Sequence, residues 1–199
     1  MKTDRMKTAL LGTAAFAGFA LGGAASASPS VPPTPEMISF ACAGCHGTSG
    51  ASAGLTMPTL ASHSKASIVD AMKKFKTGER PSTVMGRLAK GYSDADFAAM
   101  GDFFSRQKFH PTHQVVDAAK VKRGADIEEA NCSRCHLDQG KEGKDDTPVM
   151  ASQWLEYLKM QAALYDSGAR KMSKDMADKW NRLSKEDREA LLHFYASVK

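Results

Sequence analysis

Two short segments combine thiols and an imidazole at one fixed spacing. Residues 42–46 (CAGCH) and 132–136 (CSRCH) share the pattern C-x-x-C-H, and together they contain all four cysteines of the 199-residue chain. Two thiols three residues apart lie on one helical turn and can add to the two vinyl groups of a haem, while the next histidine ligates the iron. The pattern predicts two covalent c-type haems, held by Cys42, Cys45, Cys132 and Cys135.

Other uses of a C-x-x-C pair fit this chain less well. A thioredoxin-like dithiol needs a βαβ context, and no strand-like pattern surrounds either motif. A zinc site would bring its two pairs about 15–20 residues apart, whereas these pairs lie 90 residues apart. Structural disulfides do not need a histidine directly after each pair. We therefore expect haem attachment at both motifs.

The chain also aligns with itself, which indicates an internal repeat. A shift of 90 residues superimposes the two motifs and places Pro58 on Pro148; one extra residue in the second copy then changes the shift to 91. At that shift Met85 coincides with Met176, and no other two of the eleven methionines coincide with each other in the repeat. The sequence therefore predicts two copies of one haem-binding unit.

The repeated methionines are candidates for the sixth iron ligand. Met85 and Met176 each follow their histidine, His46 or His136, by about forty residues, which lets the chain wrap the haem and reach its opposite face. A thioether in that position gives His/Met ligation, which raises the reduction potential. Met172 is the alternative in the second copy.

Two prolines recur twelve residues after the ligand histidines. In small class I c-type cytochromes a proline carbonyl at this distance accepts a hydrogen bond from the second ring nitrogen and fixes the ring. A proline that only turns a loop explains one copy equally well. Because Pro58 and Pro148 occupy the same place in both copies, we expect the ligand-orienting role.

Four histidines lie outside the motifs and have no histidine partner in the repeat: His63, His110, His113 and His193. His193 coincides with Asp102 of the other copy, which favours a surface position for it.

The pattern of apolar residues predicts an all-α fold. Residues 65–77 place apolar side chains on one helical face and end at Gly78, and residues 154–166 repeat this before Gly168. Capping signatures at Ser93 and Ser184 each open a last helix. We expect two tandem class I cytochrome c-like domains, each wrapped around its haem because units of this size have small cores.

The predicted organisation begins with a signal peptide over residues 1–27, in which a basic start precedes an apolar stretch and a small-residue cleavage site. A membrane anchor is less consistent with that stretch, because four glycines interrupt it. The cytochrome domains are then predicted over 30–108 and 118–199, with a linker at 109–117. We expect an exported, periplasmic protein with no stable membrane insertion.

The net charge of +5 falls when the signal peptide leaves, because Lys2, Arg5, Lys7 and Asp4 are removed with it. The remaining basic residues are scattered, so we expect no nucleic-acid partner. No G-x-G-x-x-G segment is present, and thus no dinucleotide fold is expected. His/Met ligation at both haems also leaves no open position for a substrate, so we assign no catalytic residues.

Several segments resemble known dihaem cytochromes. The tandem pattern is similar to the cytochrome c4 family, and residues 42–50, 75–79, 82–97 and 194–197 resemble the cytochrome subunit of flavocytochrome c sulfide dehydrogenase. The segment 82–97 (STVMGRLAKGYSDADF) is the most specific of these. The resemblance covers essentially the whole mature chain, although the second copy matches more loosely.

This resemblance implies a non-catalytic electron-transfer subunit in a heterodimer with a flavoprotein. The partner would carry FAD and oxidise sulfide, and electrons would pass singly through the two haems to a small acceptor cytochrome. The alternative is a free-standing periplasmic carrier of the cytochrome c4 type.

Overall fold

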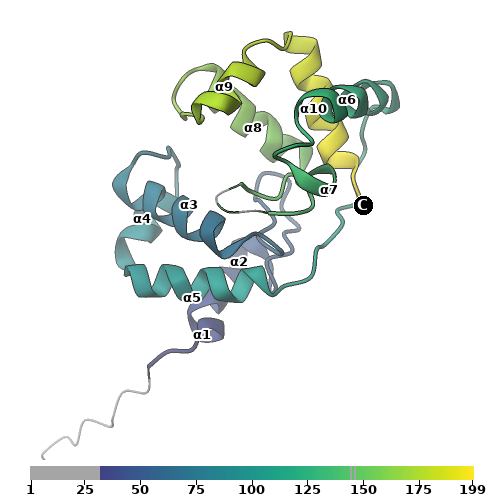
Figure 1. Cartoon of the computed structure of the whole chain (residues 1–199). Coiled ribbons are helices and arrows are strands. Elements are labelled where there is room, and N and C mark those ends of the chain that lie inside the picture. Colours follow the sequence, from purple (N-terminus) through teal and green to yellow (C-terminus); the bar gives the residue numbers. More distant parts are fainter. Residues whose placement is uncertain (1–31, 144, 146) are drawn as a thin grey trace, which may run out of the picture. The chain divides into compact units, whose positions relative to one another are not determined.

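The computed structural model describes residues 32–143, 145 and 147–199, and in those residues the chain forms helices and loops with no strand (Figure 1). The signal peptide predicted over 1–27 lies outside the described residues. Residues 33–199 form one unit. No helix among the described residues is long and apolar enough to cross a membrane.

The helices of the first copy follow the predicted order. They are α1 (Pro35–Phe40), α2 (Ala43–His46), α3 (Lys65–Thr77), α4 (Met85–Leu88), the 3-10 helix η1 (Ala89–Gly91) and α5 (Asp94–Ser105). The Ser64 hydroxyl caps α3, which ends at the left-handed Gly78. Ser93 and Asp96 form a reciprocal capping box at the start of α5. The helix predicted over 65–77 and the start predicted at Ser93 are both confirmed.

The second copy has the same order of helices. Its first helix and the helix before its last one are longer than their counterparts in the first copy. Its helices are α6 (Ala118–Asn131), α7 (Leu137–Gly140), α8 (Leu155–Asp166), α9 (Lys174–Trp180) and α10 (Lys185–Ser197). Ser184 caps α10 as predicted, since its hydroxyl accepts a hydrogen bond from the Asp187 amide. No helix lies between Ser105 and Ala118, which is where the linker at 109–117 is predicted.

The repeat extends to unusual backbone geometry. Ser62 and Ser152, equivalent at a shift of 90, both have left-handed φ angles, of 63° and 56°. Their amides donate to the carbonyl oxygens of Phe104 (3.1 Å) and Tyr195 (2.7 Å), which are themselves equivalent in the last helix of each copy. A left-handed serine is uncommon, so its recurrence with the same partner shows that both copies adopt one fold.

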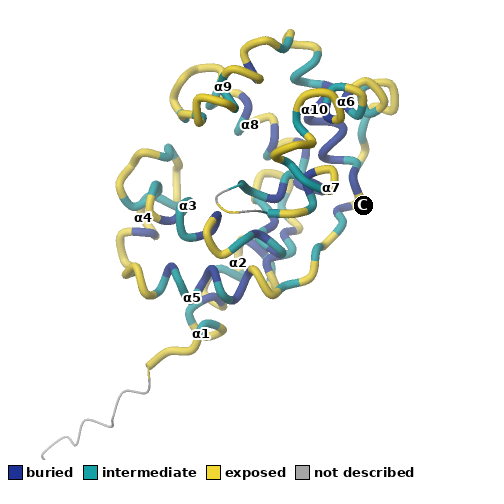
Figure 2. The backbone as a smooth tube through the Cα atoms, in the orientation of Figure 1, coloured by how far each residue is buried: buried dark blue, intermediate teal, exposed yellow. Residues whose placement is uncertain are grey.

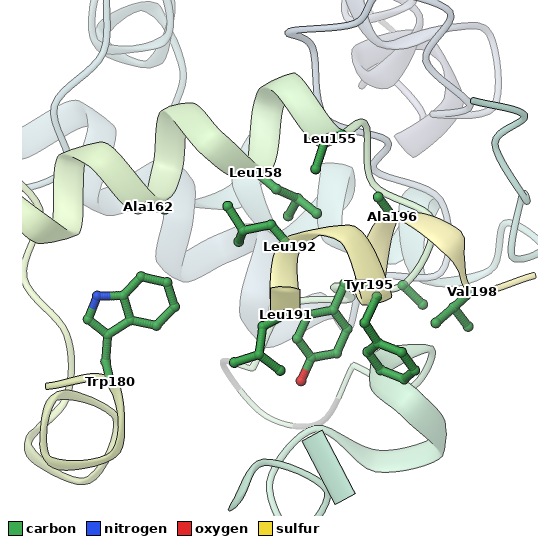
Figure 3. Packing of buried hydrophobic residues seen from close by; sticks show 11 residues of the cluster. Leu155, Leu158, Ala162, Trp180, Leu191, Leu192, Tyr195, Ala196 and Val198 are labelled. Atoms are coloured by element: carbon green, nitrogen blue, oxygen red, sulfur yellow. The ribbon is translucent and has the colours of Figure 1, made fainter. Parts of the chain in front are cut away.

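Each copy has its own hydrophobic core. In the first copy, buried residues of α3 and α5 pack together, including Phe97 and Phe104. In the second, residues of α8 and α10 pack around Leu158 and Leu191, and Trp180 closes one end of the cluster (Figure 3). Buried residues are accordingly concentrated in the last helices of both copies (Figure 2). The last helix of each copy therefore lies at its centre.

A buried glutamine joins the two copies. Gln153 is 1% exposed, and its side-chain amide donates to the Thr59 carbonyl oxygen (2.9 Å) and accepts from the Thr59 amide (3.0 Å). Next to it, the Trp154 indole N–H donates to the Ser52 carbonyl oxygen at 2.8 Å. The second copy thus satisfies backbone groups that the loop after the first motif leaves unpaired.

Replacing Gln153 by alanine should therefore weaken the junction. The change leaves the Thr59 amide and carbonyl without partners, at about 1–3 kcal/mol for each buried group. We expect a lower unfolding temperature and, because the copies lose their most buried shared hydrogen bonds, a less cooperative transition with two separable unfolding steps by calorimetry. Gln107→Ala is the matched control, since its amide bonds only the Phe103 carbonyl within its own copy. An unchanged single transition in Gln153→Ala would contradict the role of this junction.

Candidate haem sites

The first motif forms the short helix α2, at the end of which His46 is buried. The His46 side chain is 7% exposed, and its Nδ1 donates to the Pro58 carbonyl oxygen at 2.8 Å. Burial lowers the pKa of His46, while the bond to Pro58 opposes that shift. The ring is therefore neutral with its proton on Nδ1, so the Nε2 lone pair is free for a metal.

The second motif holds its histidine differently. Burial lowers the pKa of His136, so this ring is also neutral. Its buried Nδ1 has no hydrogen-bond partner among the described residues, although the adjoining loop contains residues 144 and 146, which are not described. The orienting role of Pro148 consequently stays a prediction. After His136 the chain turns sharply, with left-handed φ angles at Asp138 and Gln139.

A mostly apolar cavity in the second copy brings the predicted ligands together. Cys132, His136 and Met176 line it with Leu, Trp and Tyr side chains, and Met150 lines it as well. Met172 packs against the same core but does not line the cavity. The repeat distinguishes between the two methionines that line the cavity. Met176 coincides with Met85 of the first copy, whereas Met150 coincides with Leu60.

In the first copy, Met85 is the first residue of α4 and packs, half-buried, against the core that Cys42 also contacts. An open groove runs beside it, lined by its neighbours Val84, Gly86 and Arg87. His46 does not line that groove. The structure thus places Met85 and Cys42 on one core, while His46 lies outside the groove beside Met85.

The donor atoms present fit a covalent haem. All four cysteines are free, with one half-buried and one exposed thiol in each motif. Burial raises the pKa of both half-buried thiols, Cys42 and Cys132. Within the described ranges, no group of three His, Cys, Asp or Glu side chains converges as a metal site. Thiols on one helical turn beside a neutral, buried histidine are the set that haem attachment requires.

A buried acid near the second motif is not apparent from the motif alone. Glu128 is 4% exposed, and its buried Oε1 has no partner among the described residues. Burial raises its pKa. The Tyr195 hydroxyl lies nearby and is equally without a partner in the described part of the chain. A comparison of the two copies could have revealed this pair, because Glu128 and Tyr195 are polar at positions where the first copy has the apolar residues Ile38 and Phe104.

The surface position predicted for His193 is wrong. His193 is 8% exposed, and its Nδ1 accepts a hydrogen bond from the Asp117 amide at 3.1 Å. The ring is buried because α10 packs against α6 along this side, as the crossing of the two helices in Figure 1 shows. His193 therefore helps to fix the start of α6 rather than facing solvent.

Comparison with known proteins places this arrangement in a family. The model of the cbb3-type cytochrome c oxidase subunit III family matches residues 119–194. The cytochrome subunit of sulfide dehydrogenase from Chlorobaculum tepidum is 43% identical over 91 residues, which are 44% of this chain and 81% of that protein. Cytochrome c4 from Azotobacter vinelandii is 28% identical over 148 residues, covering 65% of this chain and 69% of the relative.

A solved structure has the same fold. Reduced cytochrome c4 from Pseudomonas stutzeri superimposes with a TM-score of 0.74 at 23% identity, over 83% of this chain and 97% of that one. The fold is accordingly all-α with two tandem class I cytochrome c-like domains, and membership of a cytochrome c family implies covalently bound haem c. The chain belongs to the family of c-type cytochromes that contains the cytochrome subunit of sulfide dehydrogenase, and it is a dihaem, cytochrome c4-like member.

Proposed function

We propose that this dihaem cytochrome is the electron-transfer subunit of a sulfide-oxidising flavocytochrome c. It would accept electrons from a partner subunit that carries FAD and pass them to a small acceptor cytochrome in the periplasm. The observation that carries the proposal is the 43% identity to a cytochrome subunit of sulfide dehydrogenase across 81% of that protein. No residue of this chain is assigned to catalysis.

Two equivalent sets of residues would hold the cofactors. Cys42 and Cys45 would attach one haem, and His46 and Met85 would be the ligands of its iron. In the second copy Cys132, Cys135, His136 and Met176 would take the same roles. A haem held by histidine and methionine would supply single-electron exchange. The shared lining of one cavity by Cys132, His136 and Met176 supports this assignment.

The protein side chains then determine how each site behaves. Neutral imidazoles keep Nε2 available for the metal, and the bond from His46 to Pro58 fixes one ring plane. The wall of the second cavity is mostly apolar, with Trp180, Leu191 and Leu192, and would shield a haem bound there from water. Such a pocket with sulfur and nitrogen ligands favours reversible electron exchange over binding of new molecules.

The alternative is a free-standing cytochrome c4-type carrier. The observation that favours it is the structural likeness to cytochrome c4, which extends over 97% of that chain. The two functions differ in one physical property, because a subunit needs a stable complex with a flavoprotein whereas a carrier meets its partners transiently.

Purification of the affinity-tagged chain from its native host should separate the two functions. We expect a flavoprotein in equal amount, about one FAD for every two haems, and rapid reduction of the haems when sulfide is added. The same chain produced in a host without the flavoprotein gene is the control, and sulfide should reduce it much more slowly. A flavin-free monomer with two haems from the native host would instead establish the carrier.

A further inference from the structure

Three cations line the open groove beside Met85 in the first copy. The groove has a volume of about 490 Å³, and its walls come from the end of α3, the loop that follows, α4 and η1. Lys76, Arg87 and Lys90 belong to these walls. Among the described residues, no carboxylate lines the groove. It is therefore a concentrated positive surface next to the proposed sixth ligand of the first haem.

These cations have no carboxylate partner in the part of the chain that the structure describes. None of the three forms a salt bridge with a described residue. Lys76 donates instead to the Tyr92 carbonyl oxygen at 2.6 Å. Two acids of the same copy are engaged elsewhere, since Asp94 pairs with Lys73 at 3.3 Å and Asp96 accepts within the capping box of α5. Unbalanced surface cations of this kind attract anions.

Two apolar side chains lie among the cations. Val84, which lines the groove, is 49% exposed, and Leu88, which follows Arg87 in α4, is 51% exposed. An exposed apolar centre with a charged rim is the composition of a protein–protein contact surface. Both residues belong to the short segment that contains Met85, so a partner docked here would lie next to the proposed ligand.

The second copy has a different surface at the equivalent positions. Where the first copy has three cations and two apolar residues, the second has three acids, one cation and one amide. The residues that coincide with Lys76, Val84, Arg87, Leu88 and Lys90 are Asp166, Asp175, Asp178, Lys179 and Asn181. Because both copies adopt one fold, the fold does not require the positive charge. The charge therefore distinguishes the surface beside the first haem site from its counterpart in the second copy.

The composition of this surface favours a transient partner over a permanent subunit. Permanent interfaces are large, at about 2,000 Å² or more, and mainly apolar. Short-lived redox contacts are smaller, and complementary charges steer the two proteins together. Two half-exposed apolar residues within a rim of cations fit the second class. The partner that such a rim selects is one with an acidic surface.

We propose that Lys76, Arg87 and Lys90, together with Val84 and Leu88, form the docking surface for the electron acceptor, a protein with carboxylates around its own redox centre. One electron would pass in each encounter from the ferrous haem of the first copy to the oxidised acceptor, with no bond or proton exchanged. The inference deepens the proposed function and rests on haem attachment and on Met85 as a ligand, but not on the identity of the electron donor.

The test measures how fast the reduced holoprotein, with both haems attached, reduces a small monohaem cytochrome c. This probe is used in two forms, one with its lysines intact and one with its lysines succinylated, so that they carry carboxylates. The variant Lys76→Gln, Arg87→Gln, Lys90→Gln should reduce the succinylated form about tenfold more slowly than the wild type at low ionic strength, and its rate should depend less on salt. Its rate with the lysine-intact form should not fall, because the same cations repel that form.

The matched control removes three exposed lysines outside the groove, as Lys108→Gln, Lys122→Gln, Lys171→Gln. This variant changes the net charge of the chain by the same amount, but we expect its rate with the succinylated form to fall by less than about twofold, since local charge steers docking. Equal falls in the two triple variants, or an unchanged rate in the groove variant, would overturn the proposal.

A second variant separates a protein partner from a small anion. Leu88→Gln retains every charge, so it should slow the reduction of the succinylated cytochrome and leave the rate with hexacyanoferrate(III) unchanged. An unchanged rate with the cytochrome would mean that the groove only attracts anions, against the proposal. Haem content and the sulfur-to-iron band are measured first. A chain that lacks either would refute the proposed function, whereas normal haems with unchanged rates would refute only this docking surface.

Discussion

Met176→Ala should abolish His/Met coordination at one of the two haems. The Met176 sulfur is the sixth ligand that we propose in the second copy, and its loss would leave that iron with a weaker ligand such as water. Methionine ligation raises the potential, so the potential of one haem should fall. The sulfur-to-iron charge-transfer band of the oxidised protein should also lose about half of its intensity. Met85→Ala should do the same to the other haem.

Three other methionines serve as controls for this experiment. Met172 and Met150 are the rivals in the second copy, since one packs against its core and the other lines its cavity. Met57 is the control for the first copy, because it is 37% exposed and coincides with Thr147 in the repeat. Loss of the band in Met172→Ala or Met150→Ala, but not in Met176→Ala, would transfer the ligand assignment.

Gly124→Ala should destabilise the second copy strongly. Gly124 lies where α6 crosses α10, and a Cβ there would be 2.3 Å from the Ala190 carbonyl oxygen and 2.7 Å from Cβ of Phe194. Backbone atoms cannot rotate away, so the helices must separate. Overpacking costs about 1–3 kcal/mol or more, which exceeds the gain of roughly 1 kcal/mol that alanine brings to a helix interior. Denaturant unfolding of the holoprotein measures the difference.

Gly91→Ala is the matched control for this variant. A Cβ at Gly91 meets no atom within 4 Å, so the free energy of unfolding should change by less than about 0.5 kcal/mol. If Gly124→Ala proved as stable as Gly91→Ala, the close approach of α6 and α10 would not be a requirement of the fold.

Local signals account for the helices that the sequence predicted correctly. The helix at Lys65–Thr77 has a serine cap and a glycine stop, and the helix from Asp94 has a complete capping box. Helix α6 begins at an Asp117 N-cap, but it has no glycine stop and its apolar residues are mostly alanines. It forms by packing against α10 through Gly124, which is a tertiary contact between segments far apart in the chain.

The candidate sites, too, could be predicted from the sequence only in part. The C-x-x-C-H spacing and the repeat predict the thiols, the histidines and one methionine pair as haem-binding residues without any structure. The bond between Nδ1 of His46 and the Pro58 carbonyl was predicted from the twelve-residue spacing and is present, whereas the environment of His136, whose Nδ1 has no described partner, was not predicted, because it depends on how the loop of the second copy folds. The sequence likewise does not show that Lys76 and Lys90 line one groove.

The junction at Thr59 has a consequence for the speed of electron exchange inside the molecule. Thr59 directly follows Pro58, whose carbonyl orients His46, and it is held on both backbone groups by Gln153 of the other copy. Electron tunnelling falls off exponentially with distance, so small fluctuations in the spacing of two redox sites would change the rate greatly. A stiff link that begins one residue from a ligand-orienting group keeps this spacing constant. The rate of internal exchange then becomes a property of the fold rather than an average over many arrangements.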